Sequence, residues 1–251
     1  MGERPRISDE RGELRSLATG SAGTRSATRA VLFDIDGTLL VTGGAGAAAW
    51  ERAFEELHGV EADIAEHTDA GMTDPEIAAI VFRAVIGREG TQEERSKAIS
   101  CYLKHLPDTV AESDGYRVMP GVEELLDRLI DSGVLLGLVT GNIEAAAHIK
   151  LARARLNRFF SFGGYGSDSP DRTEVTRAAL RRGELVSGGT LTDGACIAVG
   201  DTPRDIAAGH GAGIKVVGVA TGSYRVKQLS EVGADWAIPD LAIGRFPLEP
   251  E

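Results

Sequence analysis

The sequence predicts an α/β fold, a doubly wound parallel sheet with an inserted all-helical cap domain. Short apolar runs typical of buried parallel strands recur along the chain, beginning with AVLFDIDGTLLV at residues 30–41. Helical stretches separate the later runs, and this alternation favours a parallel sheet with helices on both faces. Residues from about 44 to 116 break the alternation, with several helical stretches and no convincing strand.

The elements of the sheet-forming part follow from local patterns. Pro120 and Gly133 bound a helix, because proline favours the first helical turn and glycine the residue after the last. The other two helices are expected at 171–185 and 202–213. The later strands are expected at residues 133–142, 159–168, 195–202 and 215–222.

The helical insertion carries its own start signals. Thr73 with Glu76, and Thr91 with Glu94, have the spacing of capping boxes. An apolar set with helical spacing follows the first box. Its members are Ile77, Ile80, Val81, Ala84 and Val85. We therefore expect residues 44–116 to form a cap domain.

The rest of the chain divides into a tail and a core. Residues 1–29 are polar, rich in Ser, Arg and Gly, and lack periodicity, so we expect a flexible tail. The change to an apolar strand at Ala30 marks the start of the core. We expect residues 30–43 and 117–251 to form the α/β catalytic core.

Composition and charge limit the possible partners. A net charge of −11 repels nucleic acid and anionic lipid, so we expect neither as a partner. No apolar run approaches the ~20 residues of a transmembrane helix, and the first residues lack the apolar centre of a signal peptide. Two distant cysteines indicate no disulfide framework. We expect a cytoplasmic protein that builds any anion site locally, from a metal ion, backbone N–H groups and a few basic side chains.

Polar side chains cluster at the predicted strand ends, where open parallel sheets bind their ligands. Three strand ends offer carboxylates and one offers a hydroxyl. Several unpaired carboxylates in one crevice require a cation, and all-oxygen ligands favour Mg²⁺. The four segments are Asp34–Thr38, Thr140–Asn142, Asp168–Arg172 and Gly200–Asp205.

Three of these motifs, DIDGT, VTGN and GDTPRDI, in this order and with a helical insertion after the first, resemble the haloacid dehalogenase superfamily. More narrowly, the chain is similar to its phosphatases with a helical cap, such as phosphoglycolate phosphatases. The resemblance covers about Ala30 to the C-terminus. It implies a Rossmann-like core and an Mg²⁺-dependent phosphatase acting on a small phosphorylated metabolite, with phosphoglycolate as one example.

The resemblance also implies roles for four carboxylates. Asp34 is expected to attack phosphorus and form an aspartyl-phosphate, and Asp36 to protonate the leaving oxygen and then deprotonate water. Asp34, the main-chain carbonyl of Asp36, Asp201 and Asp205 are the expected metal ligands, with Asp205 as a ligand or as a group that orients metal-bound water. Repulsion within the first pair is expected to favour a proton on Asp36, while Mg²⁺ keeps Asp34 ionised.

Phosphate binding is expected from the VTGN motif and one cation. Thr140 would donate its hydroxyl, and the N–H groups of Gly141 and Asn142 would open the next helix as an anion site. The family usually supplies a lysine after the third strand, and here the sequence departs from the pattern. Lys150 lies about 12 Å along a helix from the phosphate end and is not expected to reach. We expect Arg172 to supply the cation, although arginine and lysine are not equivalent.

Two other functions stay open on these residues. A sugar phosphomutase of the same fold would keep both Asp34 and Asp36 and would use its cap to bind a sugar phosphate in two orientations. A catalytically idle protein would use the fold for binding or regulation. The completeness of the constellation favours catalysis.

Several further motifs have plainer interpretations. Gly37 stands at position four of DIDGT, whereas a calcium loop needs glycine at position six. GGAGAAA at 43–49 is a formal dinucleotide fingerprint but is interpreted as a hinge into a helix. TDAGMTDPE at 68–76 is either a substrate-selecting cap loop or a simple helix cap. The histidines show no metal-ligand spacing, and Cys101 is interpreted as helix packing.

Overall fold

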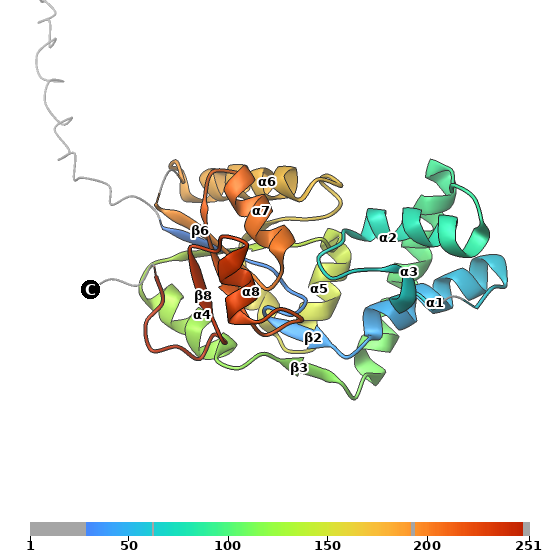
Figure 1. Cartoon of the computed structure of the whole chain (residues 1–251), viewed down its shortest axis with the longest axis horizontal. Helices are drawn as coiled ribbons and strands as arrows, with labels where there is room; N and C mark the ends of the chain where they lie inside the picture. The colour runs from blue at the N-terminus through green and yellow to red at the C-terminus, as the bar shows by residue number, and fades with distance from the viewer. Residues whose placement is uncertain (1–28, 62, 192–193, 248–251) are drawn as a thin grey trace, which may run out of the picture.

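The computed structural model describes residues 29–61, 63–191 and 194–247 of the 251-residue chain. Except for Arg29, the expected tail at 1–29 lies outside the described residues. A parallel sheet of six strands, in the order β5-β4-β1-β6-β7-β8, dominates one side of the molecule (Figure 1). Its strands are β1 Ala30–Phe33, β4 Leu135–Val139, β5 Phe162–Gly164, β6 Cys196–Gly200, β7 Lys215–Val219 and β8 Trp236–Ile238.

Helices cover both faces of the sheet, which confirms the doubly wound α/β fold. Val31 and Phe33 of β1 point into a core shared with α4 and α5, whereas Ala30 and Leu32 point into a second core under α6, α7 and α8. This alternation follows from the two-residue period of a strand. The helices are α4 Val122–Asp131, α5 Glu144–Ala152, α6 Arg172–Ser187, α7 Pro203–Gly211 and α8 Val226–Glu231.

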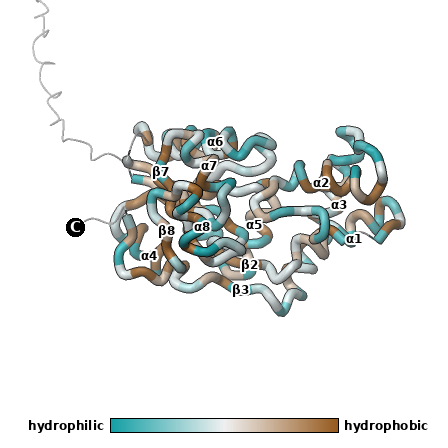
Figure 2. Tube along the Cα trace, viewed as in Figure 1, coloured by the Kyte–Doolittle hydropathy of each residue, from teal (hydrophilic) through white to brown (hydrophobic). Residues whose placement is uncertain are grey.

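The central strands are short and almost wholly apolar. Val31 pairs with Leu136 of β4 on one side and with Ile197 of β6 on the other. Figure 2 shows hydrophobic stretches along β7 within the layered part of the molecule. The three-residue β8, after the helix α8, completes the edge of the sheet and was not expected, because a run this short gives little periodicity to detect.

Three helices between the first strand and the rest of the sheet form a separate hydrophobic cluster. They are α1 Ala45–His58, α2 Asp74–Val81 and α3 Gln92–Glu112, and Figure 1 shows them beside the layered part. Short 3-10 helices lie at Ala65–His67 and, in the sheet part, at Leu156–Phe159. The stacked rings of Trp50 and Tyr102, 4.4 Å apart, and the ring of Phe54 centre this cluster. Ile143 and Ala146 of the α5 region also belong to it, so the cluster rests on the core.

Both predicted capping boxes are present, at Thr73–Glu76 and Thr91–Glu94. The apolar face expected after the first box is only partly correct, because Val81 is buried whereas Ala84 is exposed. The chain continues from α2 into a π-helix, Phe82–Ile86, and its wider turn rotates the following side chains. Phe82 therefore enters the core of the helical segment.

Two chain passes join the helical segment to the sheet, and they pair with each other. β2 (Leu40–Thr42) and β3 (Tyr116–Val118) form a small antiparallel sheet. The Ser113 hydroxyl donates to the carbonyl of Thr42 at 2.7 Å. The expected boundary at 116–117 therefore falls inside a strand, because three residues at a hinge carry no detectable period. In the part of the chain that the structure describes, no helix is long and apolar enough to span a bilayer.

Candidate functional site

Asp34 and Asp36 follow β1 at the carboxyl edge of the sheet. The Asp34 backbone N–H donates to the carbonyl of Val199 at 2.9 Å, which fixes the residue beside β6. Asp34 is buried, whereas the side chain of Asp36 is 43% exposed, and both line one cavity. Gly37, with a left-handed φ of 84°, turns the chain immediately afterwards, as its lack of a Cβ allows. An added Cβ there would also clash with the Asp201 carboxylate.

Three carboxylates from two strand ends converge. Asp34, Asp201 and Asp205 each place an oxygen within 4.8 Å of the others, and all three are buried. Thr202 caps α7 in a reciprocal box with Asp205, so one carboxylate oxygen of Asp205 is fixed by the helix start. The Thr38 hydroxyl donates to Asp201 at 3.2 Å. The sequence motifs DIDGT and GDTPRD therefore meet as predicted.

The electrostatics of this cluster are those of an under-compensated acidic site. Burial, with the charges of Asp205 and Asp201, holds the pKa of Asp34 well above its usual range. Burial and the Asp205 charge raise the pKa of Asp201 to about 7. Arg172 is the cation that contacts the cluster: its Nη2 contacts Asp205 and lies 3.6 Å from Asp34. Three carboxylates with one guanidinium leave an excess negative charge that suits a divalent cation.

Arg172 enters the site as expected, but its neighbours in SPDR do not. Asp168 pairs with Arg182 at 2.6 Å, and Asp171 caps α6 by accepting from the Thr173 backbone. The expectation that a third strand end offers carboxylates is therefore wrong. These two acids are used within the structure around β5 and α6, because each finds a nearby donor there.

The VTGN loop is present at the site with different hydrogen bonds from those expected. Thr140 is buried, and its hydroxyl oxygen accepts from the backbone and side-chain nitrogens of Asn142, at 3.2 and 2.8 Å. Helix α5 begins at Glu144 rather than at Gly141. The backbone N–H of Asn142 is thus already bonded, although its amide side chain reaches Asp36 at 2.7 Å.

Lys150 reaches the site, and the expectation that it could not is wrong. Its Nζ donates to Asp36 Oδ2 at 2.7 Å, and the residue is buried. Helical side chains point toward the helix N-terminus, so a long lysine covers the distance that rise per residue alone suggested. Burial opposes the charge, but Asp36 and Asp74 together raise the pKa of Lys150, so the amine is protonated.

This contact also bears on which oxygen of the first pair can hold a proton. Lys150 and Asn142 both donate to the same oxygen of Asp36, so the other carboxyl oxygen is the one that can carry a proton. The carboxyl group with the strongly raised pKa is Asp34, through burial first and its neighbouring acids second. The repulsion between Asp34 and Asp36 is therefore a minor influence beside burial.

Asp74 is the site residue that sequence reasoning missed. At the start of α2 it is buried, and its Oδ2 accepts from the Ile143 backbone N–H at 2.8 Å. Its own N–H donates to the carbonyl of Gly141 at 2.9 Å, so this residue fastens the helical segment to the VTGN loop. Burial raises the pKa of Asp74 to about 6. The available signal is its position in TDAGMTDPE, the segment interpreted from the sequence as either a substrate-selecting loop or a simple helix cap.

The cavity lies between the strand ends and the helical segment. Its volume is about 220 Å³, so it suits a small molecule. Asp34, Thr140 and Arg172 line it from the core. From the helical segment come Trp50, Ile64, Thr68, Asp69, Met72, Asp74, Ile77 and Tyr102.

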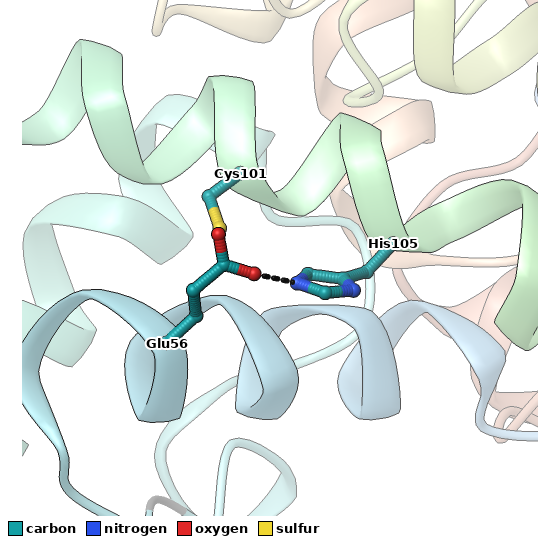
Figure 3. Close-up of side chains that lie close together, drawn as sticks. All are labelled: Glu56, Cys101 and His105. Atoms are coloured by element: carbon teal, nitrogen blue, oxygen red, sulfur yellow. Dashed lines mark hydrogen bonds and ion pairs between the residues drawn. The ribbon is translucent and has the colours of Figure 1, made fainter.

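A second group of potential ligands lies on the outer side of the helical segment (Figure 3). Glu56 of α1 points between Cys101 and His105 of α3, and accepts from His105 Nε2 at 2.8 Å. Cys101 and His105, four residues apart on α3, lie close enough to share a metal with Glu56, although the sequence was expected to hold no histidine with metal-ligand spacing. Lys104, however, donates to both oxygens of Glu56. These hydrogen bonds account for the cluster as a link between α1 and α3.

Solved structures with this architecture are numerous and share the fold. A β-phosphoglucomutase from Clostridium difficile superposes with a TM-score of 0.67 at 18% identity, covering 87% of this chain and 94% of that one. A hydrolase from Pseudomonas syringae gives a TM-score of 0.65 at 22% identity, covering 86% and 95%.

Sequence comparison is more specific. The chain is 31% identical over 222 residues to a phosphoglycolate phosphatase of Neisseria meningitidis, covering 87% of this chain and 91% of the relative. It is 23% identical to a pyrophosphatase, PpaX, of Oceanobacillus iheyensis, covering 85% and 93%. The family model described as haloacid dehalogenase-like hydrolase matches residues 28–213. The chain therefore belongs to the haloacid dehalogenase-like hydrolases, and its chemistry is that of a phosphatase of this family.

Proposed function

We propose that the protein is an Mg²⁺-dependent phosphatase that hydrolyses a small phosphate monoester through a phosphorylated Asp34. The observation that supports this most directly is the convergence of Asp34, Asp201 and Asp205 beside Arg172, with Asp34 and Arg172 lining a small cavity. Asp36 stands at the same cavity with a lysine and an amide on one of its oxygens.

The residues present fit a magnesium ion. The donor set is all oxygen, and burial leaves the pKa values of Asp34 and Asp201 raised, as expected for acids that lack a sufficient cation. Asp34, Asp201, Asp205 and the carbonyl of Asp36 would hold the ion. When bound, the ion supplies charge neutralisation between the carboxylate and the phosphate.

In the first half of the reaction, a carboxylate oxygen of Asp34 attacks phosphorus. The bond from phosphorus to the leaving oxygen breaks, and that oxygen takes a proton from Asp36. Arg172 and Thr140 bind the phosphate oxygens beside Asp34, as their shared place in the cavity suggests. Lys150 positions the Asp36 side chain through its 2.7 Å contact.

In the second half, a water molecule attacks the phosphorus of phosphorylated Asp34. Asp36 removes a proton from this water, and the bond between phosphorus and the Asp34 oxygen breaks. Inorganic phosphate leaves and both carboxyl groups return to their starting state. We propose residues 44–116 as the cap that excludes bulk water, with the Asp74 contacts to the VTGN loop in support.

Hydrolysis of a generic aryl phosphate with added Mg²⁺ tests this proposal. The full chain should release phosphate, and a chelator should stop the release. Absence of Mg²⁺-dependent release at any pH between 5 and 9 would overturn the assignment. The names of the relatives make phosphoglycolate the first metabolite to assay. A cytoplasmic location and the absence of a nucleic-acid partner stay predictions from the sequence.

A phosphomutase is the second candidate, favoured by the likeness in fold to β-phosphoglucomutases. Both reactions share the first half. Conversion of a sugar 1-phosphate to its 6-isomer without net phosphate release would favour the mutase.

A further inference from the structure

The two sides of the cavity differ in charge. On the core side, Arg172 faces Asp34 and Asp205. On the side of the helical segment, the charged side chains that line the cavity are Asp69 and Asp74. Among the lining residues that the structure describes, the cations are Arg172 and Lys150, and each already contacts a carboxylate of the core.

Lys150 does not make the charge on this side of the cavity positive. Its ammonium group donates to Asp36 at 2.7 Å, and Asp74 is a second negative charge near it. Asp69 and Asp74 alone exceed this one positive charge. Arg204 of α7 pairs with Glu76 at 3.6 Å and is not among the residues that line the cavity. A leaving group with its own carboxylate or phosphate would therefore meet excess negative charge.

One buried hydrogen-bond donor in the cavity lining has no partner among the described residues. Trp50 is buried and lines the cavity, and its indole Nε1 has no hydrogen-bond partner in the described part of the chain. The indole N–H lies near the Asp74 carboxyl group and acts to lower its pKa, but no hydrogen bond of good geometry joins the two groups. An unsatisfied buried donor costs free energy, so a ligand that accepts from it gains that contribution.

A hydroxyl group matches this pair. It can accept from Trp50 Nε1–H and donate to the Asp74 carboxylate at the same time. A carboxylate accepts from the indole but is repelled by Asp74, and an ammonium group donates to Asp74 but cannot accept from the indole. The apolar neighbours Ile64 and Ile77 leave room for carbon.

We propose that the substrate carries an uncharged, hydroxyl-bearing leaving group, as in a polyol or sugar phosphate, rather than a carboxylate or a second phosphate. Trp50 and Asp74 are then the specificity-determining pair. This inference rests on the proposed phosphatase function and narrows its substrate class. It separates this chain from the substrates in the names of its relatives, phosphoglycolate and pyrophosphate.

The test uses glycerol 3-phosphate and 3-phosphoglycerate, which differ in a hydroxymethyl group against a carboxylate. With Mg²⁺ and the full chain, kcat/KM should be at least about tenfold higher for glycerol 3-phosphate, as expected for one unfavourable charge contact. The kcat/KM values for phosphoglycolate and pyrophosphate should be as low as that for 3-phosphoglycerate. Equal values, or a preference for the anionic member, would overturn the proposal.

Two variants locate the discrimination. Trp50→Phe keeps the ring and removes the donor, so kcat/KM for glycerol 3-phosphate should fall about two- to tenfold relative to an aryl phosphate. Asp74→Asn should narrow the ratio between the matched pair. Asp108→Asn makes the same charge change on an exposed face of α3, outside the cavity, and should leave the ratio unchanged. If Asp74→Asn leaves the kcat/KM ratio of the matched pair unchanged, and Trp50→Phe leaves kcat/KM for glycerol 3-phosphate unchanged relative to the aryl phosphate, specificity is determined by other residues.

A binding measurement separates the failure of this inference from the failure of the proposed function. The Asp34→Asn variant with Mg²⁺ should bind glycerol 3-phosphate more tightly than 3-phosphoglycerate by calorimetry, whether or not the wild-type protein turns either over. The reverse order of Kd overturns the substrate class. Absence of aryl phosphate hydrolysis by the wild-type protein overturns the phosphatase proposal alone.

Discussion

The two walls of the cavity contrast in what they do and in how visible they are in the sequence. The wall from the sheet holds Asp34 and Arg172, and the Asp201 carboxylate lies close to that of Asp34. The wall from the helical segment contributes Trp50 and Asp74 from two helices packed on that edge. The first wall holds groups suited to phosphate, and the second holds groups suited to what the phosphate is attached to. Chemistry and specificity are therefore separable by substitution.

The largest effect should come from the core wall. Asp34→Asn removes the nucleophile, and kcat for an aryl phosphate should fall by about a thousandfold or more, because no other group can take its place. Initial rates with Mg²⁺ measure this. Activity within about tenfold of wild type in a folded variant would contradict the role of Asp34.

Lys150 joins the two walls, because it contacts Asp36 and lies near Asp74. Lys150→Met keeps the stem and removes the donor, and we expect kcat to fall about ten- to a hundredfold, with a smaller change in KM. The loss should be smaller for an aryl phosphate with a good leaving group, which needs little protonation. Equal losses for good and poor leaving groups would show that Lys150 does not act through Asp36.

Arg172 tests the phosphate end alone. Arg172→Ala should raise KM about tenfold or more through loss of a charge-assisted contact, and Arg172→Lys should restore part of it. Arg182→Ala is the matched control, since Arg182 pairs with Asp168 away from the cavity. Unchanged KM and kcat in Arg172→Ala would move the cation role to another residue.

The smallest expected effect is on stability and depends on pH. The folded pKa values of Asp34, Asp201 and Asp74 are raised, so the folded protein binds more protons than the unfolded chain. Metal-free stability should therefore fall as pH rises from about 4 toward about 7. Bound Mg²⁺ favours the ionised form of the site acids, so it should raise Tm more at pH 8 than at pH 5. The Asp201→Asn variant should show a smaller rise in Tm with Mg²⁺. A rise in Tm that is the same at both pH values and the same in both proteins would contradict a metal held by these acids.

Much of the core wall was predictable, because its residues follow strands with strong apolar character. Asp34 and Asp201 stand directly after β1 and β6, and parallel strands bring such positions to one edge. Asp168 was misassigned to the site because strand-end position does not reveal a local partner such as Arg182. Lys150 was missed because rise per residue ignores the reach and direction of a side chain.

The helical wall was not predictable to the same degree. Asp74 stands in a helix-cap motif, where an acid is expected for local reasons alone. Its second role, accepting from Ile143, depends on how the helical segment packs on the VTGN loop, and no local pattern records that packing. The ring of Trp50 lies in the core of the helical segment, and only the structure shows that its indole N–H has no hydrogen-bond partner among the described residues.

The central claim is that the core wall forms a covalent bond to phosphorus, and acid-quenched mass spectrometry tests it most directly. The wild-type protein is mixed with Mg²⁺ and an aryl phosphate, quenched during turnover and digested. We predict a phosphoryl group on the peptide that contains Asp34, and its absence in Asp34→Asn. Steady turnover with that peptide unmodified throughout, or with the phosphoryl group on another residue, would contradict the account.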